Sequence, residues 1–162
     1  MDKIRASLWF DTQAEEAARF YTSIFKDSKL GGIARYPDAG QDVTGKPPGS
    51  VMTVEFEVNG LPFIALNGGP DFKFNEAISF EIPCADQAEV DYYWERLTEG
   101  GDPAAQQCGW LKDKFGLSWQ VVPRAMGELL TSPDAEKSKR AFEAMLKMKK
   151  IDLGALQQAF NG

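Results

Sequence analysis

The chain has 162 residues, which suits one domain or two small modules that share a core. Its composition is ordinary for a globular protein, with 43% hydrophobic, 26% charged and 12% aromatic residues. The formal net charge of −6 argues against nucleic acid or an anionic membrane as a partner, and no apolar run reaches the roughly 20 residues of a membrane span.

The cysteine and histidine content excludes several kinds of chemistry. Cys84 and Cys108 have no C-x-x-C spacing, so neither a disulfide scaffold nor a thiolate metal site is indicated. The N-terminus has no signal-peptide core, and we therefore expect a reduced, cytoplasmic protein. Because the chain contains no histidine, a Ser-His-Asp triad cannot be built.

The first half of the chain reads as a strand, a helix and three further strands. Residues Ile4–Phe10 alternate apolar and polar, and Asp11 or Thr12 is expected to cap a helix over Gln13–Phe25, with Thr12 and Glu15 at the spacing of a capping box. Asn59-Gly60 supplies the positive-φ pair of a tight hairpin turn. The remaining expected elements are a strand at Ser28–Tyr36, a long polar loop or lid at Pro37–Ser50, and hairpin strands at Val51–Glu57 and Leu61–Leu66.

The second half repeats this order. Gln87-Ala88-Glu89 matches Gln13-Ala14-Glu15, and Phe115-Gly116-Leu117-x-Trp119 matches Asn59-Gly60-Leu61-x-Phe63. Each half therefore predicts a strand, a helix and three strands. The expected elements here are a strand at Ala77–Pro83, a helix at Gln87–Glu99 capped by Asp86, and a final hairpin at Cys108–Pro123, with Ile78, Phe80 and Trp119 pointing into helix-packed cores.

After Pro123 the pattern becomes helical. The expected helices are Arg124–Thr131, Ala135–Lys149 and Ile151–Phe160, and the second has an apolar stripe of Ala141, Phe142, Met145, Leu146 and Met148. Such amphipathic helices need a surface to cover, either their own module or a partner subunit. The sequence thus predicts an α+β fold of tandem βαβββ modules with curled mixed sheets, plus C-terminal helices. The modules span residues 1–69 and 70–123, and the helical extension spans 124–162, in one compact domain overall.

This tandem pattern resembles the vicinal-oxygen-chelate superfamily, which holds the glyoxalases, bleomycin-resistance proteins and extradiol dioxygenases. The stretch L-W-F-D-x-Q-A-E-E-A at Leu8–Ala17, Phe20-Tyr21, L-N-G-G-P at Leu66–Pro70 and the hairpin at Cys108–Pro123 look like its PhnB-like branch. Members of that branch are often labelled 3-demethylubiquinone 3-methyltransferase. The resemblance covers Ile4 to Pro123 and implies that each module curls into a cup whose concave face holds a ligand and, in the enzymes, a divalent metal.

Alternation along the strands predicts which side chains face the cup. From the first half these are Arg5, Ser7, Trp9, Thr53, Glu55, Glu57, Ala65 and Asn67, and from the second half Ala77, Ser79, Glu81, Trp110, Lys112, Ser118, Gln120 and Val122. We expect the ligand-binding residues to be Arg5, Trp9, Asn67, Ser79, Glu81, Trp110, Lys112 and Gln120. Trp9, Trp110, Phe72 and Phe74 could form an aromatic wall or pack in a core, and Cys108 could be a reactive thiol or a buried small side chain.

The resemblance implies that the usual metal is missing. The positions of the metal ligands in metal-dependent relatives fall near Arg5, Ala65, Ala77 and Gln120, and neither alanine nor arginine ligates a divalent cation. A shifted carboxylate set of Glu55, Glu57 and Glu81 is the alternative. We expect no metal and no other cofactor, and Arg5 favours a ligand with a carboxylate or phenolate.

Two classes of function remain open at this stage. One is a metal-free protein that binds a small organic molecule, and the other is an enzyme that uses carboxylate or amide groups of the cup, with Glu81 and Gln120 as the catalytic candidates. A methyltransferase is disfavoured because neither a doubly wound sheet nor a glycine-rich first turn is present in the pattern. Because curled sheets leave edges that a partner commonly covers, we also expect a homodimer.

Overall fold

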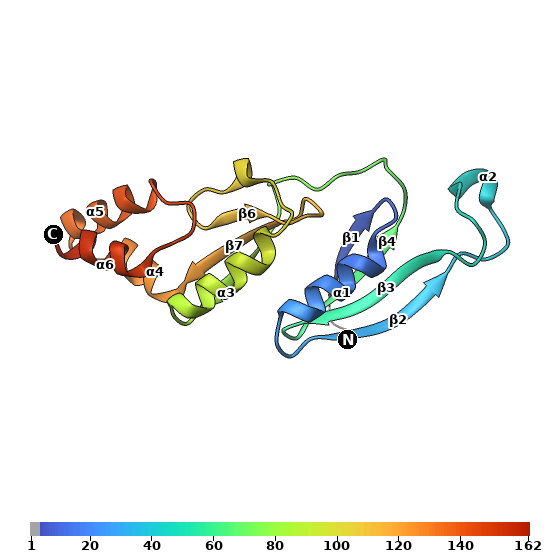
Figure 1. Ribbon diagram of the computed structural model, residues 1–162, viewed down its shortest axis with the longest axis horizontal. Helices are drawn as coiled ribbons and strands as arrows, with labels where there is room; N and C mark the ends of the chain where they lie inside the picture. Colours follow the sequence, from blue (N-terminus) through green and yellow to red (C-terminus); the bar gives the residue numbers. More distant parts are fainter. Residues whose placement is uncertain (1–3) are drawn as a thin grey trace. The chain divides into compact units, whose positions relative to one another are not determined.

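The computed structural model describes residues 4–162 and divides into two compact units, Met1–Lys73 and Phe74–Gly162 (Figure 1). The first unit contains β1 Ala6–Phe10, α1 Ala14–Ile24, β2 Lys29–Arg35, α2 Gln41–Thr44, β3 Val51–Val58 and β4 Leu61–Asn67. The second contains β5 Ser79–Cys84, α3 Gln87–Thr98, a 3-10 turn η1 Pro103–Ala105, β6 Trp110–Lys112, β7 Ser118–Pro123, α4 Arg124–Leu130, α5 Ala135–Met145 and α6 Leu153–Asn161.

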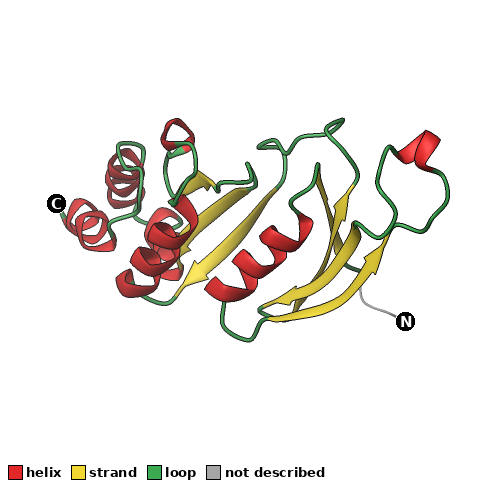
Figure 2. Ribbon diagram, turned by 45° about the vertical axis from the view of Figure 1, so that its right-hand side comes forward, coloured by secondary structure: helices red, strands yellow, loops and turns green. Residues whose placement is uncertain are grey.

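The first unit is a four-stranded mixed sheet in the order β1-β4-β3-β2, in which β1 is parallel to β4. Helix α1 lies along one face of this sheet (Figure 2). Small side chains on the helix, Ala14, Ala17 and Ala18, are fully buried and let it approach the strands closely. The sheet contributes an apolar face that includes Leu8, Phe10, Val54, Phe56, Phe63 and Ala65.

The predicted hairpin turn of the first unit is confirmed. Strands β3 and β4 pair antiparallel out to Val58 and Leu61, and Asn59 and Gly60 adopt φ values of 47° and 78°. Two successive positive φ angles are what a two-residue turn needs to match the twist of the strands, and glycine adopts them without a Cβ penalty. The loop that precedes β3 contains the short helix α2, which the sequence did not predict.

The second unit is a three-stranded mixed sheet in the order β5-β7-β6, in which β5 is parallel to β7. Helix α3 covers one face with Val90, Trp94 and Leu97, which are buried. The predicted cap is confirmed, because the Asp86 carboxylate accepts a hydrogen bond of 3.0 Å from the Glu89 N–H.

The βαβββ-like arrangement is present, but the second module departs from the predicted strand count. In the second unit, all of which is described, two strands rather than three follow the helix. The intervening residues 99–107 contain Gly100, Gly101 and Pro103 and form a turn and η1 instead. Gly101 passes so close to the chain that a Cβ there would lie 2.2 Å from the Lys112 carbonyl oxygen. The positive φ of Gly100 (72°) and Pro103 at the start of η1 interrupt regular strand geometry in this segment.

Two core predictions for the second sheet need correction. Trp119 is buried, and Phe80 lies 5.6 Å from it between ring centroids, but Phe80 is only half-buried. Ile78 is 69% exposed because β5 begins one residue later, at Ser79. The predicted alternation is therefore right for the strand and wrong for the residues before it.

The C-terminal helices pack on one another and connect to the hairpin of their own unit. Helix α5 contacts both α4 and α6. The N–H groups of Cys108 and Gly109 donate to the carbonyls of Met148 and Lys149 at 2.9 and 2.8 Å. Helix α5 ends at Met145, four residues earlier than predicted, and of the predicted stripe Ala141 alone is fully buried, with Phe142 and Leu146 exposed. No helix within residues 4–162 is long and apolar enough to cross a membrane.

Candidate functional site

The pairing of the strands defines which side chains share the face of the first sheet opposite α1. Ser7 pairs with Ile64, Trp9 with Leu66, and Glu55 with Ile64 from the other side. The predicted positions of Ala65 and Asn67 on this face are wrong. Both lie on the face covered by α1, where they are buried. Strand β4, Leu61–Asn67, has apolar residues on both faces, so the sequence does not show which set of alternating positions is buried. The prediction chose the wrong set and therefore placed both residues on the wrong face.

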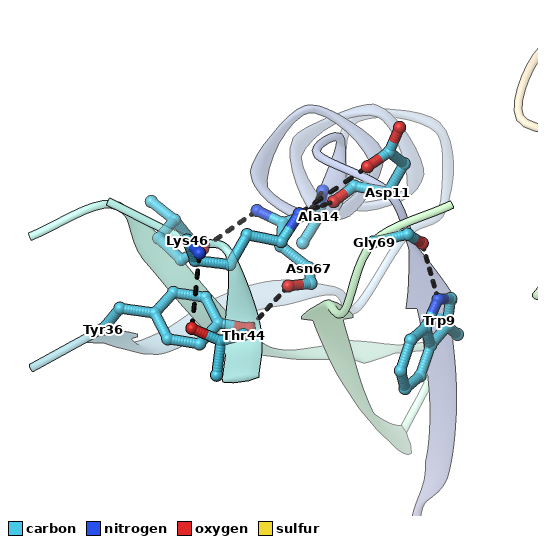
Figure 3. A network of polar contacts seen from close by, with 9 residues as sticks. Trp9, Asp11, Ala14, Tyr36, Thr44, Lys46, Asn67 and Gly69 are labelled. Atoms are coloured by element: carbon cyan, nitrogen blue, oxygen red, sulfur yellow. Dashed lines mark hydrogen bonds and ion pairs between the residues drawn. The ribbon is translucent and has the colours of Figure 1, made fainter. Parts of the chain in front are cut away.

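Asn67 connects three parts of the first unit (Figure 3). Its side-chain oxygen accepts a hydrogen bond of 2.8 Å from the Ala14 N–H, and its amide donates to the Val51 carbonyl at 3.1 Å. Its main-chain carbonyl accepts from the Tyr36 hydroxyl at 2.7 Å. Asn67 thus supplies the partner at the start of α1, where Gln13 is the N-cap and no side-chain cap from Thr12 forms. The predicted capping box is therefore wrong, and the Asn67 carboxamide is engaged by the fold.

Trp9 lies on the face opposite α1 and packs against the bend that follows β4. Its indole Nε1 donates to the Gly69 carbonyl at 2.8 Å, and its ring meets Phe72 edge-on at 4.9 Å between centroids. A Cβ on Gly68 would lie 2.2 Å from this indole, so the close approach requires glycine at position 68. Two of the four aromatic residues expected in a wall, Trp9 and Phe72, do come together.

The loop Pro37–Ser50 is attached to the turn between β1 and α1. The Lys46 ammonium donates to the Asp11 carbonyl at 3.0 Å and lies 3.6 Å from its carboxylate, as Figure 3 shows. The two ends of the loop are joined by hydrogen bonds between Tyr36 and Ser50 and between Gly49 and Tyr36. The loop predicted as a lid is therefore attached to the rest of the first unit through the largely buried side chain of Lys46.

Arg5 and the first-half carboxylates form surface ion pairs. Arg5 contacts Glu55 at 2.6 Å, and Lys29 lies 3.6 Å from Glu57. These four residues line a shallow pocket of about 190 Å³. The Arg5 guanidinium thus has a partner within the protein itself.

The second sheet brings together most of the predicted site residues. Ser79, Glu81, Trp110, Lys112, Ser118 and Gln120 share the face opposite α3, because Ser79 pairs with Ser118, Glu81 with Gln120, Trp110 with Gln120, and Lys112 with Ser118. The Gln120 amide donates to the Ser79 hydroxyl at 2.9 Å. Glu81 is exposed, whereas Ser79, Trp110 and Gln120 are half-buried. This face combines an aromatic ring with amide, hydroxyl and charged groups.

Ser118 is the unusual member of this face. Its side chain is 1% exposed, and its hydroxyl has no hydrogen-bond partner among the described residues. An unpaired buried hydroxyl costs about 1–3 kcal/mol and calls for an explanation. The sequence placed Ser118 on this face but gave no sign that it would be buried without a partner.

Lys112 and Glu76 form an ion pair beside Ser118. Lys112 is the cross-strand neighbour of Ser118, and its ammonium contacts the carboxylate of Glu76 in the segment before β5. The hydrogen bond from Lys112 lowers the pKa of the Glu76 carboxyl and so favours its carboxylate form. The sequence did not indicate this pair, since it depends on how the segment before β5 runs past β6.

Asp113 organises the turn between β6 and β7, and sequence reasoning also missed it. One carboxylate oxygen accepts from the N–H groups of Phe115 and Leu117 at 2.9 and 3.1 Å, and the other accepts from the Trp119 indole at 2.8 Å. The side chain is 2% exposed. Asp113 therefore fixes the register of the hairpin that carries Trp110, Lys112, Ser118 and Gln120. An acidic residue three positions before the turn glycine was the only available signal.

The donor set on these faces does not fit the divalent cation of the superfamily. The open face of β4 presents Ile64 and Leu66, which have no ligating atom, and Arg5 on the neighbouring segment is itself a cation. Ala77 lies outside β5. Across residues 4–162 no group of three or more Cys, Asp or Glu side chains could hold a metal ion. We therefore derive no step through a metal.

Each unit has a mixed sheet with a helix on one face, and solved structures of the vicinal-oxygen-chelate superfamily share this fold. The similar structures include the PA1353 protein from Pseudomonas aeruginosa, with 19% identity over 76% of this chain and 98% of that one and a TM-score of 0.57. They also include the fosfomycin resistance protein FosX from Mesorhizobium loti, with 15% identity over 75% and 90% of the two chains and a TM-score of 0.51. At these identities the likeness concerns the fold alone.

A closer match defines the family. The family model described as 3-demethylubiquinone-9 3-methyltransferase matches residues 2–122, and the chain belongs to this PhnB-like family. It is 32% identical to a PhnB protein from Bacillus cereus described as a putative 3-demethylubiquinone-9 3-methyltransferase, over 75% of this chain and 99% of that one, with a TM-score of 0.63. No curated protein matches the chain at a significant level.

Proposed function

We propose that the protein binds a small organic molecule on the face of the second sheet opposite α3, without a divalent metal. The observation that carries this proposal is the convergence of Trp110, Gln120 and Ser79 around the buried, unpaired hydroxyl of Ser118. An aromatic surface with a few fixed polar groups is the ordinary composition of a site for an organic ligand. Arg5 and Trp9, on the face of the first sheet opposite α1, are proposed as ligand contacts of that unit by itself.

A fragment screen tests this proposal. Ligand-observed NMR of the wild-type protein should give hits in the micromolar to millimolar range, and Trp110→Ala should lose them because its ring supplies most of the apolar contact area. Tyr92→Ala is the matched control, since Tyr92 is an exposed aromatic residue on α3 in the same unit. Equal binding of the same hits by wild type and Trp110→Ala would show that the site lies elsewhere.

The alternative proposal is an enzyme that uses Glu81 and Gln120. It is supported by their direct cross-strand pairing, which places a carboxylate next to an amide. Methyl transfer is not favoured, because residues 4–162 form neither the doubly wound sheet nor the glycine-rich turn that usually hold S-adenosylmethionine. Calorimetry with S-adenosylmethionine, Zn²⁺, Ni²⁺ and Mn²⁺ should give no binding, and micromolar binding of any of them would overturn this part of the proposal.

We also propose that the protein is a cytoplasmic homodimer. Two features support dimerisation: every residue of the edge strand β2 is exposed, and Phe142 and Leu146 on or beside α5 are exposed apolar side chains. Light scattering at micromolar concentration should give twice the chain mass of 17.9 kDa. A monomer would refute the dimer.

A further inference from the structure

The ion pair between Lys112 and Glu76 bears on the chemical class of the ligand. Lys112 is held largely within the protein, with 24% of its side chain exposed, whereas 63% of the Glu76 side chain is exposed. Glu76 comes from the loop before β5, and Lys112 is part of the sheet. The cation is therefore built into the site, and the carboxylate is the movable member.

The hydroxyl of Ser118 lies on the same face as this cation. Lys112 and Ser118 are directly paired across β6 and β7, and Ser79 pairs with Ser118 from the other side. The Ser79 hydroxyl accepts a hydrogen bond from the Gln120 amide, whereas the buried Ser118 hydroxyl has no hydrogen-bond partner among the described residues. A hydroxyl donor and an ammonium group on the same face can together recognise a carboxylate.

We infer that the ligand carries a carboxylate, which replaces that of Glu76 at Lys112 and accepts a hydrogen bond from Ser118. This inference rests on the proposed function, since it concerns the same face. In the structure Glu76 holds the position at Lys112 that the ligand carboxylate would take, and the ligand has to displace it. Its release costs little, because an ion pair with an exposed partner is weak.

The rest of the face sets the shape and charge of the ligand. Trp110 lies diagonal to Ser118, one pairing step along the hairpin, and gives a flat apolar body a surface to stack on. The Gln120 side-chain oxygen stays available as an acceptor while its amide donates to Ser79. Glu81, paired with Gln120, repels a second negative charge. The site therefore fits a planar monocarboxylic acid better than a dicarboxylate or a phosphate ester.

The test uses benzoate as the probe and benzamide as its neutral match, added to the full-length protein at low salt. Binding is followed by the indole N–H resonance of Trp110, identified by its loss in Trp110→Ala. Benzoate should bind at least threefold more tightly than benzamide. Glu76→Gln should tighten benzoate binding about two- to fivefold, the range of a weak exposed ion pair, and leave benzamide unchanged. Lys112→Met should remove the preference for benzoate, and Ser118→Ala should weaken benzoate about tenfold.

Glu95→Gln is the matched control, because it removes the same charge from an exposed position on α3. The inference is overturned if Glu76→Gln and Glu95→Gln have the same effect on benzoate binding, or if benzamide binds as tightly as benzoate. It is also overturned if benzoate at about 10 mM shifts no Trp110 resonance in either wild type or Glu76→Gln. This concentration is roughly the weakest affinity expected of a fragment. Fragment hits that depend on Trp110 but show no preference for acids would overturn this inference and leave the proposed function standing. An absence of any Trp110-dependent hit would defeat the proposed function itself.

Discussion

Replacing Asp113 by alanine should be among the most damaging changes in the second unit. The carboxylate is buried and accepts three hydrogen bonds, from the N–H groups of Phe115 and Leu117 and from the Trp119 indole. The bonds to Leu117 and Trp119 are themselves buried. Each buried donor left unpaired costs about 1–3 kcal/mol, and the half-exposed Phe115 N–H costs less because water can reach it. The expected loss of unfolding free energy is therefore about 3–5 kcal/mol.

Asp113→Asn and Asp102→Ala sharpen this prediction. Asparagine keeps one acceptor oxygen but directs an N–H₂ group at one of the donors, so we expect about half of the alanine loss. Asp102 caps the exposed η1 turn by accepting a single bond from the Ala104 N–H, and its removal should cost about 1 kcal/mol or less.

Urea titrations followed by NMR provide the measurement, with the Trp119 indole resonance as the local probe and equal m-values as the condition for comparison. In Asp113→Ala this resonance should also move toward the position of a solvent-exposed indole. A loss below about 1 kcal/mol, or an indole resonance that does not move, would contradict the role given to Asp113 as the support of the hairpin.

Two further predictions concern the first sheet and the pH dependence of stability. Gly68→Ala should lower the unfolding free energy by about 1–3 kcal/mol, because its Cβ would lie 2.2 Å from the Trp9 indole. Gly127→Ala in α4 is the control and should be neutral or stabilising, because no atom lies within 4 Å of the added Cβ. Equal melting midpoints for the two variants would refute this prediction. Burial, and then the charges of Glu89 and Asp86, raise the pKa of the Cys84 thiol from 9.0 to about 12. Because the folded-state pKa is the higher one, this contribution to stability is complete below pH 9 and is lost as the pH rises toward 12. The difference in unfolding free energy between wild type and Cys84→Ala should therefore shrink by up to about 1.4 kcal/mol per pH unit in this window, and a constant difference would refute the assignment.

The sequence by itself determined the order of the elements and most of their faces. Period-two alternation in Ser118–Pro123 and the matching hairpin around Asn59-Gly60 are local properties, since they depend on the pleat of a strand and on the φ angles of two residues. The same is true of the Asp86 cap, whose donor lies three residues along the chain. For these reasons the α+β class, the family and the shared face of Ser79, Glu81, Trp110, Lys112 and Gln120 could all be predicted.

Only the tertiary structure determined the helix cap and the strand face for which the local sequence pattern differed from the contact made by a distant residue. Thr12 and Glu15 have the spacing of a capping box, yet the first N–H of α1 is satisfied by Asn67, 53 residues away. A strand that is apolar on both faces carries no parity signal, so the side on which Ala65 and Asn67 lie was set by the packing of α1.

The details that distinguish the candidate site also depend on partners that are distant in the sequence. The pair of Lys112 with Glu76, the three bonds to Asp113 and the unpaired hydroxyl of Ser118 each depend on segments that only folding brings together. Alternation identifies the face on which a polar side chain lies, but burial and partners depend on what packs above it. The sequence therefore determined which residues share this face of the second sheet, and the tertiary structure decided which of them already have a hydrogen-bond or ion-pair partner within the protein.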